Sequence, residues 1–404
     1  MGSKKQTNKN HYTLIVLSGV TLALVIVGLQ LVDSFVLPIS AVEVSAPKTI
    51  TIESSEIESP TPDELDLAAH AIVENERYQT DYTTRMLALA NNGLFELLST
   101  STREVISTTT GSTTTETVPA IPARQLYAEH TESYPAERSY PNTGAILPFR
   151  RIVAYYGNFL DTRMGALGEF PPEEMKQMLM EEVANWEAAD PSTPVIPAID
   201  YVAMVAQADA GNDGMYRRMM PTSEIDKAHQ LAKEVDGILI LEVQAGLADL
   251  QTEIERFEPW LKYPDVHLAL DPEFAMHDGA RPGTVIGSVN AQDVNRAAAY
   301  LKELADEHNL PPKVMLVHRF TQNMVQNATA IEPNDKVQIV MVMDGWGPPA
   351  NKINTYYQIL EPEPVQFTGF KVFYKNDMKP PSTALLTPAE ILDLSPKPIF
   401  IQYQ

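Results

Sequence analysis

Short apolar segments rich in β-branched residues recur from Arg151 to the C-terminus, and amphipathic helical stretches separate most of them. Strands that alternate with helices form parallel sheets. Eight strand–helix units within about 250 residues match the usual size of a closed (β/α)8 barrel. We therefore predict an α/β fold of the TIM-barrel type for residues 151–404. The eight predicted strands are 152–156, 195–199, 237–243, 266–270, 314–318, 337–343, 370–374 and 399–403.

The stretches between these strands carry apolar residues at helical spacing. Pro171 and Pro172 suit the start of the first helix. We expect Ser223 to cap the second helix and the fourth helix to begin after Asn290. The apolar positions of the first, third and fourth helices are Met175, Leu179, Val183, Trp186, Leu250, Ile254, Phe257, Leu261, Val294, Ala298 and Leu301.

The connections between the predicted elements are asymmetric. Those that lead into strands are short, whereas several that leave strands are long, namely 157–170, 201–221 and 275–290. In a (β/α)8 barrel, functional residues gather at the carboxyl ends of the strands, where the long loops lie. Any site is therefore expected on that face.

A pair of acids at the end of the fourth predicted strand is the candidate catalytic centre. The apolar run from Val266 leads into Asp271, Pro272 and Glu273. Side chains alternate along a strand, so both carboxylates should project to the same side. Two carboxylates this close repel each other and raise the pKa of one, as a general acid requires. The alternative is that Asp271 caps the turn and Glu273 is solvated.

Acids and tyrosines also stand at the ends of the other predicted strands. Buried charges are costly without a partner or a function. Glu242 either faces the site or is a structural acid paired with Arg319 or Lys371. Trp346 either stacks on a sugar ring or plugs the barrel mouth. The predicted catalytic residues are Glu273, Asp271 and Asp344. The predicted substrate-binding residues are Tyr156, Asp200, Glu242, His318, Arg319, Trp346 and Tyr374. Tyr155 and Tyr403 are the remaining tyrosines at the ends of predicted strands.

Composition and motifs exclude several classes of function. The formal net charge of −23 argues against a nucleic-acid partner, because phosphate binding depends on clustered Lys and Arg. The chain has no cysteine, which excludes disulfides and thiolate ligands. It also has no phosphate-binding loop, nucleophile elbow or compact set of metal ligands. We therefore expect no cofactor and no resident metal.

The N-terminus has the pattern of a membrane anchor. Residues 1–12 contain three lysines and no acid, and residues 13–32 contain no charge. Twenty such residues can span a bilayer, and the preceding lysines favour a cytoplasmic N-terminus. This organisation predicts a single-pass cell-membrane protein with an extracellular C-terminal domain. A signal peptide cleaved near 39–41 or 44–46 is the alternative, although the apolar run is longer than a usual signal core.

Residues 33–150 are rich in Ser, Thr, Pro and Glu, which predicts an extracellular spacer. Apolar residues at mixed helical spacing indicate a helical segment near 64–98. The segment 107–118 has the composition of a flexible tether.

Several sequence blocks carry a resemblance to known proteins. The blocks V-A-Y-Y-G-N, R-M-G-A-L-G-E, L-A-L-D-P-E-F, V-H-R-F and V-M-D-G-W-G-P-P resemble a group of uncharacterised exported bacterial TIM-barrel proteins. More distantly, the D-x-E after the fourth strand is similar to that of barrel glycoside hydrolases of the chitinase and muramidase types. That resemblance implies that Glu273 is the general acid and that Asp271 orients or stabilises. The chain departs from the muramidase type in having Tyr155 and Tyr156 where an Asp is found on the first strand.

These observations predict a membrane-anchored extracellular barrel that hydrolyses a polysaccharide by carboxylate acid–base catalysis. Its expected partners are a carbohydrate or cell-wall ligand and the membrane. One alternative is a non-catalytic surface barrel that binds a glycan or a protein. The other is a metal-dependent hydrolase that uses Asp271, His318 and Asp344.

Overall fold

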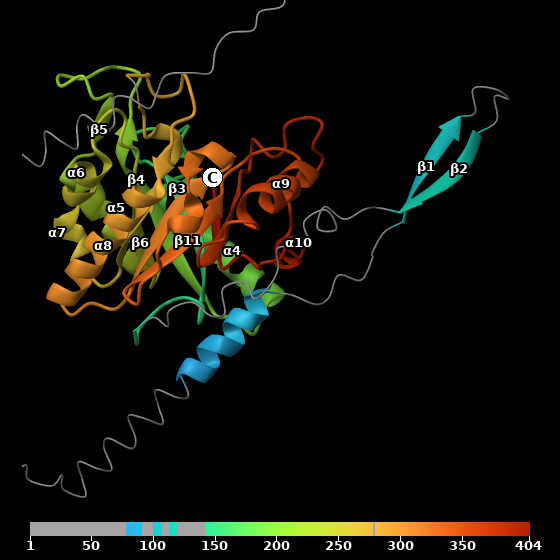
Figure 1. Ribbon diagram of the computed structural model, residues 1–404, viewed down its shortest axis with the longest axis horizontal. Helices are drawn as coiled ribbons and strands as arrows, with labels where there is room; N and C mark the ends of the chain where they lie inside the picture. The colour runs from blue at the N-terminus through green and yellow to red at the C-terminus, as the bar shows by residue number, and fades with distance from the viewer. Residues whose placement is uncertain (1–77, 91–99, 107–112, 120–141, 278) are drawn as a thin grey trace, which may run out of the picture. The chain divides into compact units, whose positions relative to one another are not determined.

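A computed structural model of the chain describes residues 78–90, 100–106, 113–119 and 142–404 except 278 (Figure 1). The predicted anchor at 13–32 lies outside these residues. None of the helices in the described part of the chain is long and apolar enough to cross a membrane.

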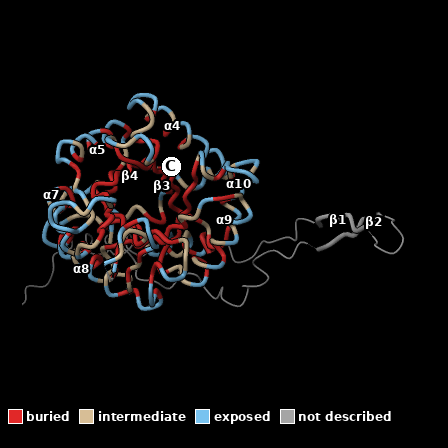
Figure 2. The backbone as a smooth tube through the Cα atoms, turned by 90° about the horizontal axis from the view of Figure 1, so that it is seen from above, coloured by how far each residue is buried: buried red, intermediate tan, exposed pale blue. Residues whose placement is uncertain are grey.

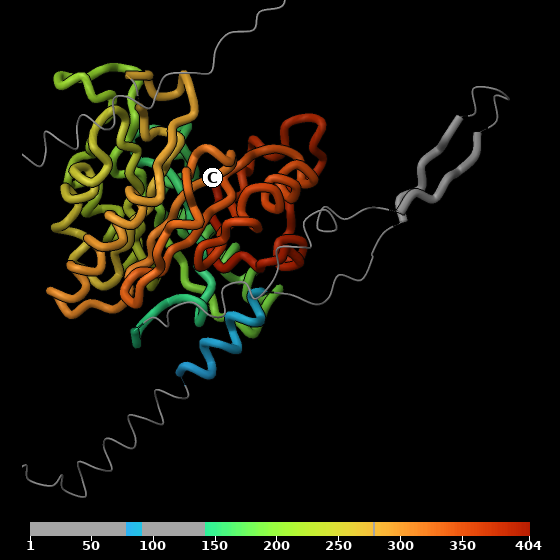
Figure 3. Tube along the Cα trace, viewed as in Figure 1, coloured from blue at the N-terminus to red at the C-terminus, as the bar shows by residue number. Residues whose placement is uncertain are grey.

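Eight parallel strands close into a barrel, which confirms the predicted fold class. The order is β3-β13-β12-β11-β9-β7-β6-β4, and β3 pairs with both β13 and β4, so the sheet has no gap. Figure 3 traces the chain around the barrel from green to red. The strands are β3 (Arg151–Gly157), β4 (Val195–Ala206), β6 (Ile238–Val243), β7 (Val266–Leu270), β9 (Lys313–Arg319), β11 (Val337–Met343), β12 (Phe367–Val372) and β13 (Phe400–Tyr403).

The position of the seventh strand differs from the prediction of 370–374. β12 begins at Phe367, which pairs with Val340, and ends at Val372, which pairs with Tyr403. The cluster of aromatic residues at 370–374 favoured the later position, but two parallel neighbours fix the register here. Lys371 therefore lies near the carboxyl end of the strand and not near its start, and Tyr374 lies beyond the end.

Helices pack around the barrel, and the predicted apolar positions are all buried. α8 begins after Asn290, as expected, and a capping box forms there, in which the side chains of Asn290 and Asp293 accept hydrogen bonds from each other's backbone N–H groups. The predicted Ser223 cap is wrong: α5 begins at Thr222 after Pro221, and this end makes no side-chain cap hydrogen bond. The helices are α3 (Ala166–Glu169), α4 (Pro172–Ala189), α5 (Thr222–Glu234), α6 (Leu250–Glu255), α7 (Glu258–Leu261), α8 (Ala291–Glu307), α9 (Pro349–Thr355) and α10 (Pro388–Leu392).

Short elements decorate the loops. β5 (Arg217–Met219) pairs with the end of β4 in antiparallel fashion, and β8 (Val289–Asn290) pairs with β10 (Val325–Gln326). A 3-10 turn, η3 (Pro272–Phe274), follows β7 directly. The other turns are η4 (Gln322–Met324) and η5 (Ala328–Ala330), and a π-helical turn, η6 (Tyr356–Leu360), extends α9.

The core has two layers, one between strands and helices and one inside the barrel. Buried residues gather toward the barrel centre, and exposed residues lie on its outer side (Figure 2). Inward-facing residues alternate with outward-facing ones along each strand. Ile152, Ala154, Val340 and Val342 belong to the inner layer, which fills the amino-terminal part of the barrel.

A helix over residues 78–90 closes the amino-terminal end of the barrel. Tyr82, Met86 and Leu89 belong to the inner core layer. The carbonyl of Leu89 accepts a hydrogen bond from the backbone N–H of Lys397 (2.6 Å), just before β13. This helix falls within the segment where the sequence predicts one, and it joins the barrel core.

A strand, β2, forms within the predicted tether 107–118, and its partner β1 lies just before that segment. β1 (Thr100–Ile106) pairs antiparallel with β2 (Thr113–Pro119). The run of threonines that indicates a low-complexity tether is also β-branched, and β-branched residues favour strands. The domain boundaries proposed from the sequence stay predictions.

Candidate active site

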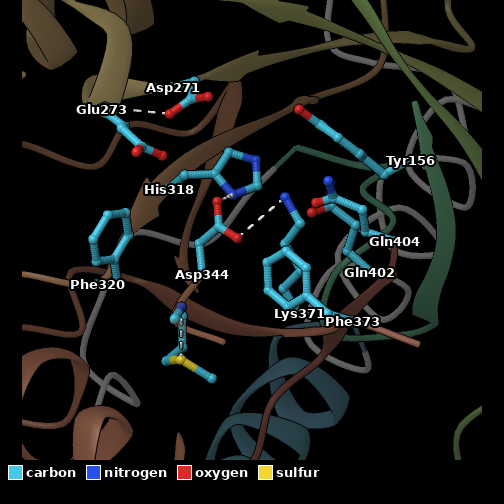
Figure 4. Close-up of polar contacts among 12 residues, drawn as sticks. Tyr156, Asp271, Glu273, His318, Phe320, Asp344, Lys371, Phe373, Gln402 and Gln404 are labelled. Carbon is cyan, nitrogen blue, oxygen red and sulfur yellow. Dashed lines mark hydrogen bonds and ion pairs between the residues drawn. The ribbon is translucent and has the colours of Figure 1, made fainter. Parts of the chain in front are cut away.

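A cavity of about 700 Å³ opens at the carboxyl ends of the strands, on the face that the loop asymmetry predicts. Polar side chains from the strand ends form its inner wall, and aromatic residues from the loops form its rim. Figure 4 shows the side chains of Asp271, Glu273, Asp344 and Lys371 around one space. The polar residues of the inner wall include Tyr156, Gln244, Asp271, Glu273, Asp344 and Lys371, and the aromatic ones of the rim are Phe274, Phe320, Trp346 and Phe373. Asp161, Arg163, Gln207, Thr355 and Gln404 also line the cavity.

Asp271 and Glu273 both line this cavity. Asp271 caps the turn η3, since its Oδ1 accepts a hydrogen bond from the backbone N–H of Glu273 (3.2 Å). Its Oδ2 accepts a second bond from Gln244 Nε2 (3.0 Å). Asp271 therefore caps the turn and also lines the cavity, because η3 directs the side chains of Asp271 and Glu273 into the same space.

Burial raises the pKa of both carboxyl groups. The pKa of Asp271 lies well above its ordinary value because of burial and the nearby Glu242. The pKa of Glu273 is raised by burial and by the charge of Asp344. Both groups therefore favour the protonated form more than ordinary carboxyl groups do.

Asp344 follows β11 and is held between two cations. Its Oδ1 lies 3.1 Å from Lys371 Nζ, and its Oδ2 lies 3.3 Å from His318 Nδ1. Burial alone would raise the pKa of Asp344, but the charges of Lys371 and His318 outweigh burial and lower it. Asp344 is therefore favoured as the ionised carboxylate of the cavity.

His318 and Lys371 favour their charged forms. Burial opposes the charge on each, but Glu242 and Asp344 raise the pKa of His318 well above its ordinary value. The same two acids raise the pKa of Lys371. Lys371 Nζ also lies 3.9 Å from the centre of the Tyr156 ring, which adds a cation–π contact.

A deeper set of buried groups lies beneath the cavity. Asp200 Oδ2 accepts a hydrogen bond from Gln402 Nε2 (2.5 Å). Burial and the charge of Glu242 raise the pKa of Asp200 to about 8. Asp200, Glu242 and His318 each offer a ligand atom within 4.8 Å of the others, so these three could hold a metal ion. That set differs from the predicted Asp271, His318 and Asp344.

The structure settles the partner of Glu242. Its Oε2 lies 3.1 Å from His318 Nε2, and its Oε1 accepts a hydrogen bond from the Tyr156 hydroxyl (3.3 Å). Glu242 pairs with His318 and not with Arg319, since Arg319 faces away from the barrel interior and pairs with Glu363 (2.7 Å). Arg319 directly follows the inward-facing His318, so alternation along β9 sends it outward.

Tyr374 also lies away from the cavity. Its hydroxyl bonds Glu182 on α4 (2.8 Å) and the Tyr155 hydroxyl (2.9 Å). Tyr403 likewise accepts a hydrogen bond from Trp186 on α4 (2.9 Å). These tyrosines belong to the layer between strands and helices, because the true end of β12 and the alternation along β3 and β13 place them there.

Trp346 lies on the cavity rim with 57% of its surface exposed. Lys379 Nζ lies 4.9 Å from the centre of its ring. The indole therefore remains accessible to a ligand and does not plug the barrel.

Sequence reasoning missed Gln244 and Gln402 and gave Lys371 only as a partner of Glu242. Gln244 stands two residues after Glu242, so alternation along the strand would have placed it on the same side. Gln402 stands two residues before Gln404, so the two side chains lie on the same side of the chain, and Gln404 lines the cavity. Lys371 was assigned to the wrong end of its strand.

The chain matches no protein-family model and no curated protein sequence. Its fold resembles that of Bacillus subtilis mannanase man26, at 12% identity over 63% of this chain and 80% of that chain, with a TM-score of 0.33. It also resembles a ruminal GH26 endo-β-1,4-mannanase, at 10% identity over 70% of this chain and 62% of that chain, with a TM-score of 0.28. A third such structure is a GH5-4 broad-specificity endoglucanase from an uncultured bovine rumen ciliate. It is 9% identical over 58% of this chain and 76% of that chain, with a TM-score of 0.32.

Likeness at this level carries no argument about the reaction. The chain's own topology defines the class: a (β/α)8 barrel with a cavity of paired and unpaired acids at the carboxyl ends of its strands. Any function must be argued from these side chains.

Proposed function

We propose that the barrel is a glycoside hydrolase that acts on a polysaccharide, with Glu273 as the general acid. One observation carries this proposal. Glu273 and Asp344 line the same cavity, and their surroundings raise the pKa of the first and lower that of the second. Carboxyl groups whose pKa values are pushed apart are suited to acid and base roles in glycoside hydrolysis.

In this mechanism the protonated Glu273 donates its proton to the leaving glycosidic oxygen. Asp344 acts as the nucleophile or as the base that activates water, depending on whether the two carboxyl groups stand about 5 Å or up to about 9.5 Å apart across the substrate. Asp271 is less suited to that role, since its own pKa is raised. Its bonds to Gln244 and to the Glu273 backbone suit an orienting role.

The aromatic rim supports a carbohydrate as the ligand. An exposed indole offers a flat apolar surface, and Phe320 and Phe373 add to it beside the polar floor. Sugar rings present both an apolar face and hydroxyl groups, and a cavity with a few convergent polar groups among aromatic ones can bind both.

The location of the protein belongs to the same proposal. Support comes from the uncharged run 13–32 with lysines before it. An anchor there would present the barrel to extracellular or cell-wall polysaccharide. Protease treatment of intact cells should then remove the barrel, and protection of the barrel would contradict this location.

The decisive test replaces Glu273 by Gln in the full-length protein and measures release of reducing sugars from a panel of plant, fungal and bacterial polysaccharides. The variant keeps the shape of the side chain but cannot ionise or donate an acidic proton, so turnover should fall at least about a hundredfold, as expected for loss of a general acid. Glu174→Gln, an exposed change on α4, is the control and should keep full activity. Equal turnover of Glu273→Gln and the wild type would remove the assignment.

A second candidate is a barrel that binds glycan without cleaving it. It is favoured by the engagement of both Asp344 oxygens by cations, which would make that carboxylate a poor nucleophile. In that case the wild type would retain polysaccharide without releasing product, and Glu273→Gln would change affinity only.

A further inference from the structure

Three buried side chains converge inside the barrel, beneath the cavity. Asp200 on β4, Glu242 on β6 and His318 on β9 each offer a ligand atom within 4.8 Å of the other two. Side chains two residues apart on a strand face the same side, so these three occupy the barrel layer above the apolar one. The residues two places before them all belong to the inner core layer, namely Ala198, Ile240 and Leu316.

One polar atom of each of these side chains makes no hydrogen bond with any described residue. The atoms are Asp200 Oδ1, Glu242 Oε2 and His318 Nε2. All three residues are at most 1% exposed, so bulk solvent does not supply the missing partners. A buried polar atom without a partner is costly, and here three such atoms lie together. Two oxygens and a ring nitrogen in one place are suited to bind a cation.

We propose that Asp200, Glu242 and His318 bind a divalent transition-metal ion, and that Zn²⁺ fits the set best. Glu242 Oε2 lies 3.1 Å from His318 Nε2. Ligand atoms at about 2.0–2.1 Å from a tetrahedral Zn²⁺ lie about 3.3 Å apart, so this pair is already spaced as two ligands of one ion. No wider separation in the set exceeds 4.8 Å, so closure onto the ion requires shifts of about 1.5 Å or less.

The other oxygen of each carboxylate is held by a neighbour. Asp200 Oδ2 accepts a hydrogen bond from Gln402 Nε2 (2.5 Å), and Glu242 Oε1 accepts one from the Tyr156 hydroxyl (3.3 Å). Carboxylates that bind metal ions are oriented in this way by outer hydrogen bonds. Gln402 Oε1 is a further buried atom without a hydrogen bond among the described residues, so it or a water would take the fourth position.

His318 has the arrangement of a metal-bound histidine. Its Nδ1 lies 3.3 Å from Asp344 Oδ2, and its Nε2 points away from that carboxylate, on the side of Glu242 (Figure 4). A histidine that binds a metal usually donates its other ring N–H to a carboxylate, a carbonyl or water. The ion would take the lone pair of Nε2, and the N–H of Nδ1 would face Asp344.

The charge of the barrel interior favours a divalent ion. Without an ion, protons on Asp200 and His318 supply part of the compensation, because Glu242 helps to raise the pKa of both. An ion replaces these protons and brings two positive charges to the same place. Lys371 also lies among the acids. The carboxyl groups of this interior are those of Asp200, Glu242, Asp271 and Asp344.

The ligand types select the ion, and the burial selects its role. One imidazole and two carboxylates suit Zn²⁺, whereas Ca²⁺ takes about six to eight oxygens and Mg²⁺ keeps several of its waters. The three ligands do not line the cavity, although Gln244 and Phe320, two residues after Glu242 and His318, do. An enclosed ion joins β4, β6 and β9 and does not activate water in the cavity. This structural role does not depend on the proposed function.

The first experiment locates the ion. Crystals of the full-length protein are grown with one equivalent of ZnCl₂, and anomalous scattering is measured at the zinc absorption edge. The proposal expects a peak among Asp200, Glu242 and His318. Zinc on surface side chains only, or zinc bound by Asp271 or Glu273 in the cavity, would overturn it.

The second experiment measures Zn²⁺ affinity in solution, by competition with a chromophoric chelator after the protein has been stripped of metal. The wild type should bind one ion at this site. Loss of an outer partner costs about 10–100-fold in metal affinity, so Tyr156→Phe should weaken binding by about that amount. Glu242→Gln and His318→Ala change the ligands themselves and should weaken it at least about a hundredfold. Wild-type affinity in Glu242→Gln would overturn the proposal.

The matched control is His229→Ala. His229 is buried on α5 and faces a single carboxylate, Asp265 (2.9 Å). This variant should bind Zn²⁺ as the wild type does, and Zn²⁺ should raise the melting temperature of both but not of Glu242→Gln. An equal rise in all three proteins would show that the ion binds elsewhere. If the wild type cleaves no polysaccharide, the proposed function fails, but the binding results still decide the metal site.

Discussion

At the scale of single residues, the partner of each charge decides what the charge can do. Glu273, Asp271 and Asp344 share one cavity, yet only Asp344 has two cations on its oxygens. The same side chain in solution would have an ordinary pKa. The division between a candidate acid and a candidate carboxylate base therefore comes from neighbours on other strands and not from residue type.

Asp200 should make the stability of the protein depend on pH. Its pKa is about 8 in the fold, against an ordinary 3.8, because of burial and Glu242. Between these values the folded state keeps a proton that the unfolded state has lost, so stability falls as pH rises through this window. Asp200→Asn cannot ionise and should lose less stability between pH 5 and pH 8 in urea unfolding. Asp209→Asn is the exposed control and should behave as the wild type does. If Asp200→Asn, Asp209→Asn and the wild type all lose the same stability between pH 5 and pH 8, the buried titration of Asp200 is contradicted.

At the scale of elements, a buried ion pair joins the loops that frame the cavity. Asp377 Oδ2 lies 2.7 Å from Lys352 Nζ on α9 and accepts the backbone N–H of Phe373 (2.9 Å). Its Oδ1 accepts the N–H of Gly347, the residue after Trp346 (2.9 Å). One carboxylate thus ties the loop after β12 to the loop after β11 and to the helix that follows it.

Breaking this pair should destabilise the whole carboxyl face. Asp377→Asn leaves Lys352 buried without its counter-charge, and the loss of one partner of a buried pair costs about 3–5 kcal/mol of unfolding free energy. Guanidinium unfolding measures the loss, and Asp393→Asn, an exposed change after α10, should cost little. The double change Lys352→Met with Asp377→Leu should recover part of the loss; if Asp377→Asn is as stable as the wild type, the pair does not hold the loops.

At the scale of the whole molecule, the barrel includes a segment far outside the eight strands. The helix at residues 78–90 packs Tyr82, Met86 and Leu89 into the inner core layer at the amino-terminal end. A fragment that starts at Arg151 would leave that end uncovered. The folding unit is therefore larger than the strand pattern alone predicts.

Met86→Ala tests this role of the helix. Met86 is fully buried, and truncation of such a residue costs about 2–5 kcal/mol. Leu87, its neighbour on the same helix, has 55% of its surface exposed, so Leu87→Ala should change stability by less than about 0.5 kcal/mol. Equal effects of the two changes in urea unfolding would show that the helix does not pack on the barrel.

The sequence by itself determined the periodic part of this protein. Six of the eight strands begin and end within one residue of the predicted positions, because alternating apolar strands and amphipathic helices are local patterns. β12 is shifted, and β4 continues to Ala206, into the segment 201–221 that the sequence predicts as a loop. The same patterns placed Asp271, Glu273 and Asp344 at strand ends on one face. The fold class followed from the number and spacing of these units.

Tertiary structure alone decided which strand-end residues meet. The register of β12 against its two neighbours brought Lys371 into the barrel and left Tyr374 outside, and one step along β9 separated His318 from Arg319. Side-chain direction reverses with every residue of a strand, so a small error in register exchanges interior for exterior. Pairing between residues that are distant in sequence fixes that register, and no local pattern contains it.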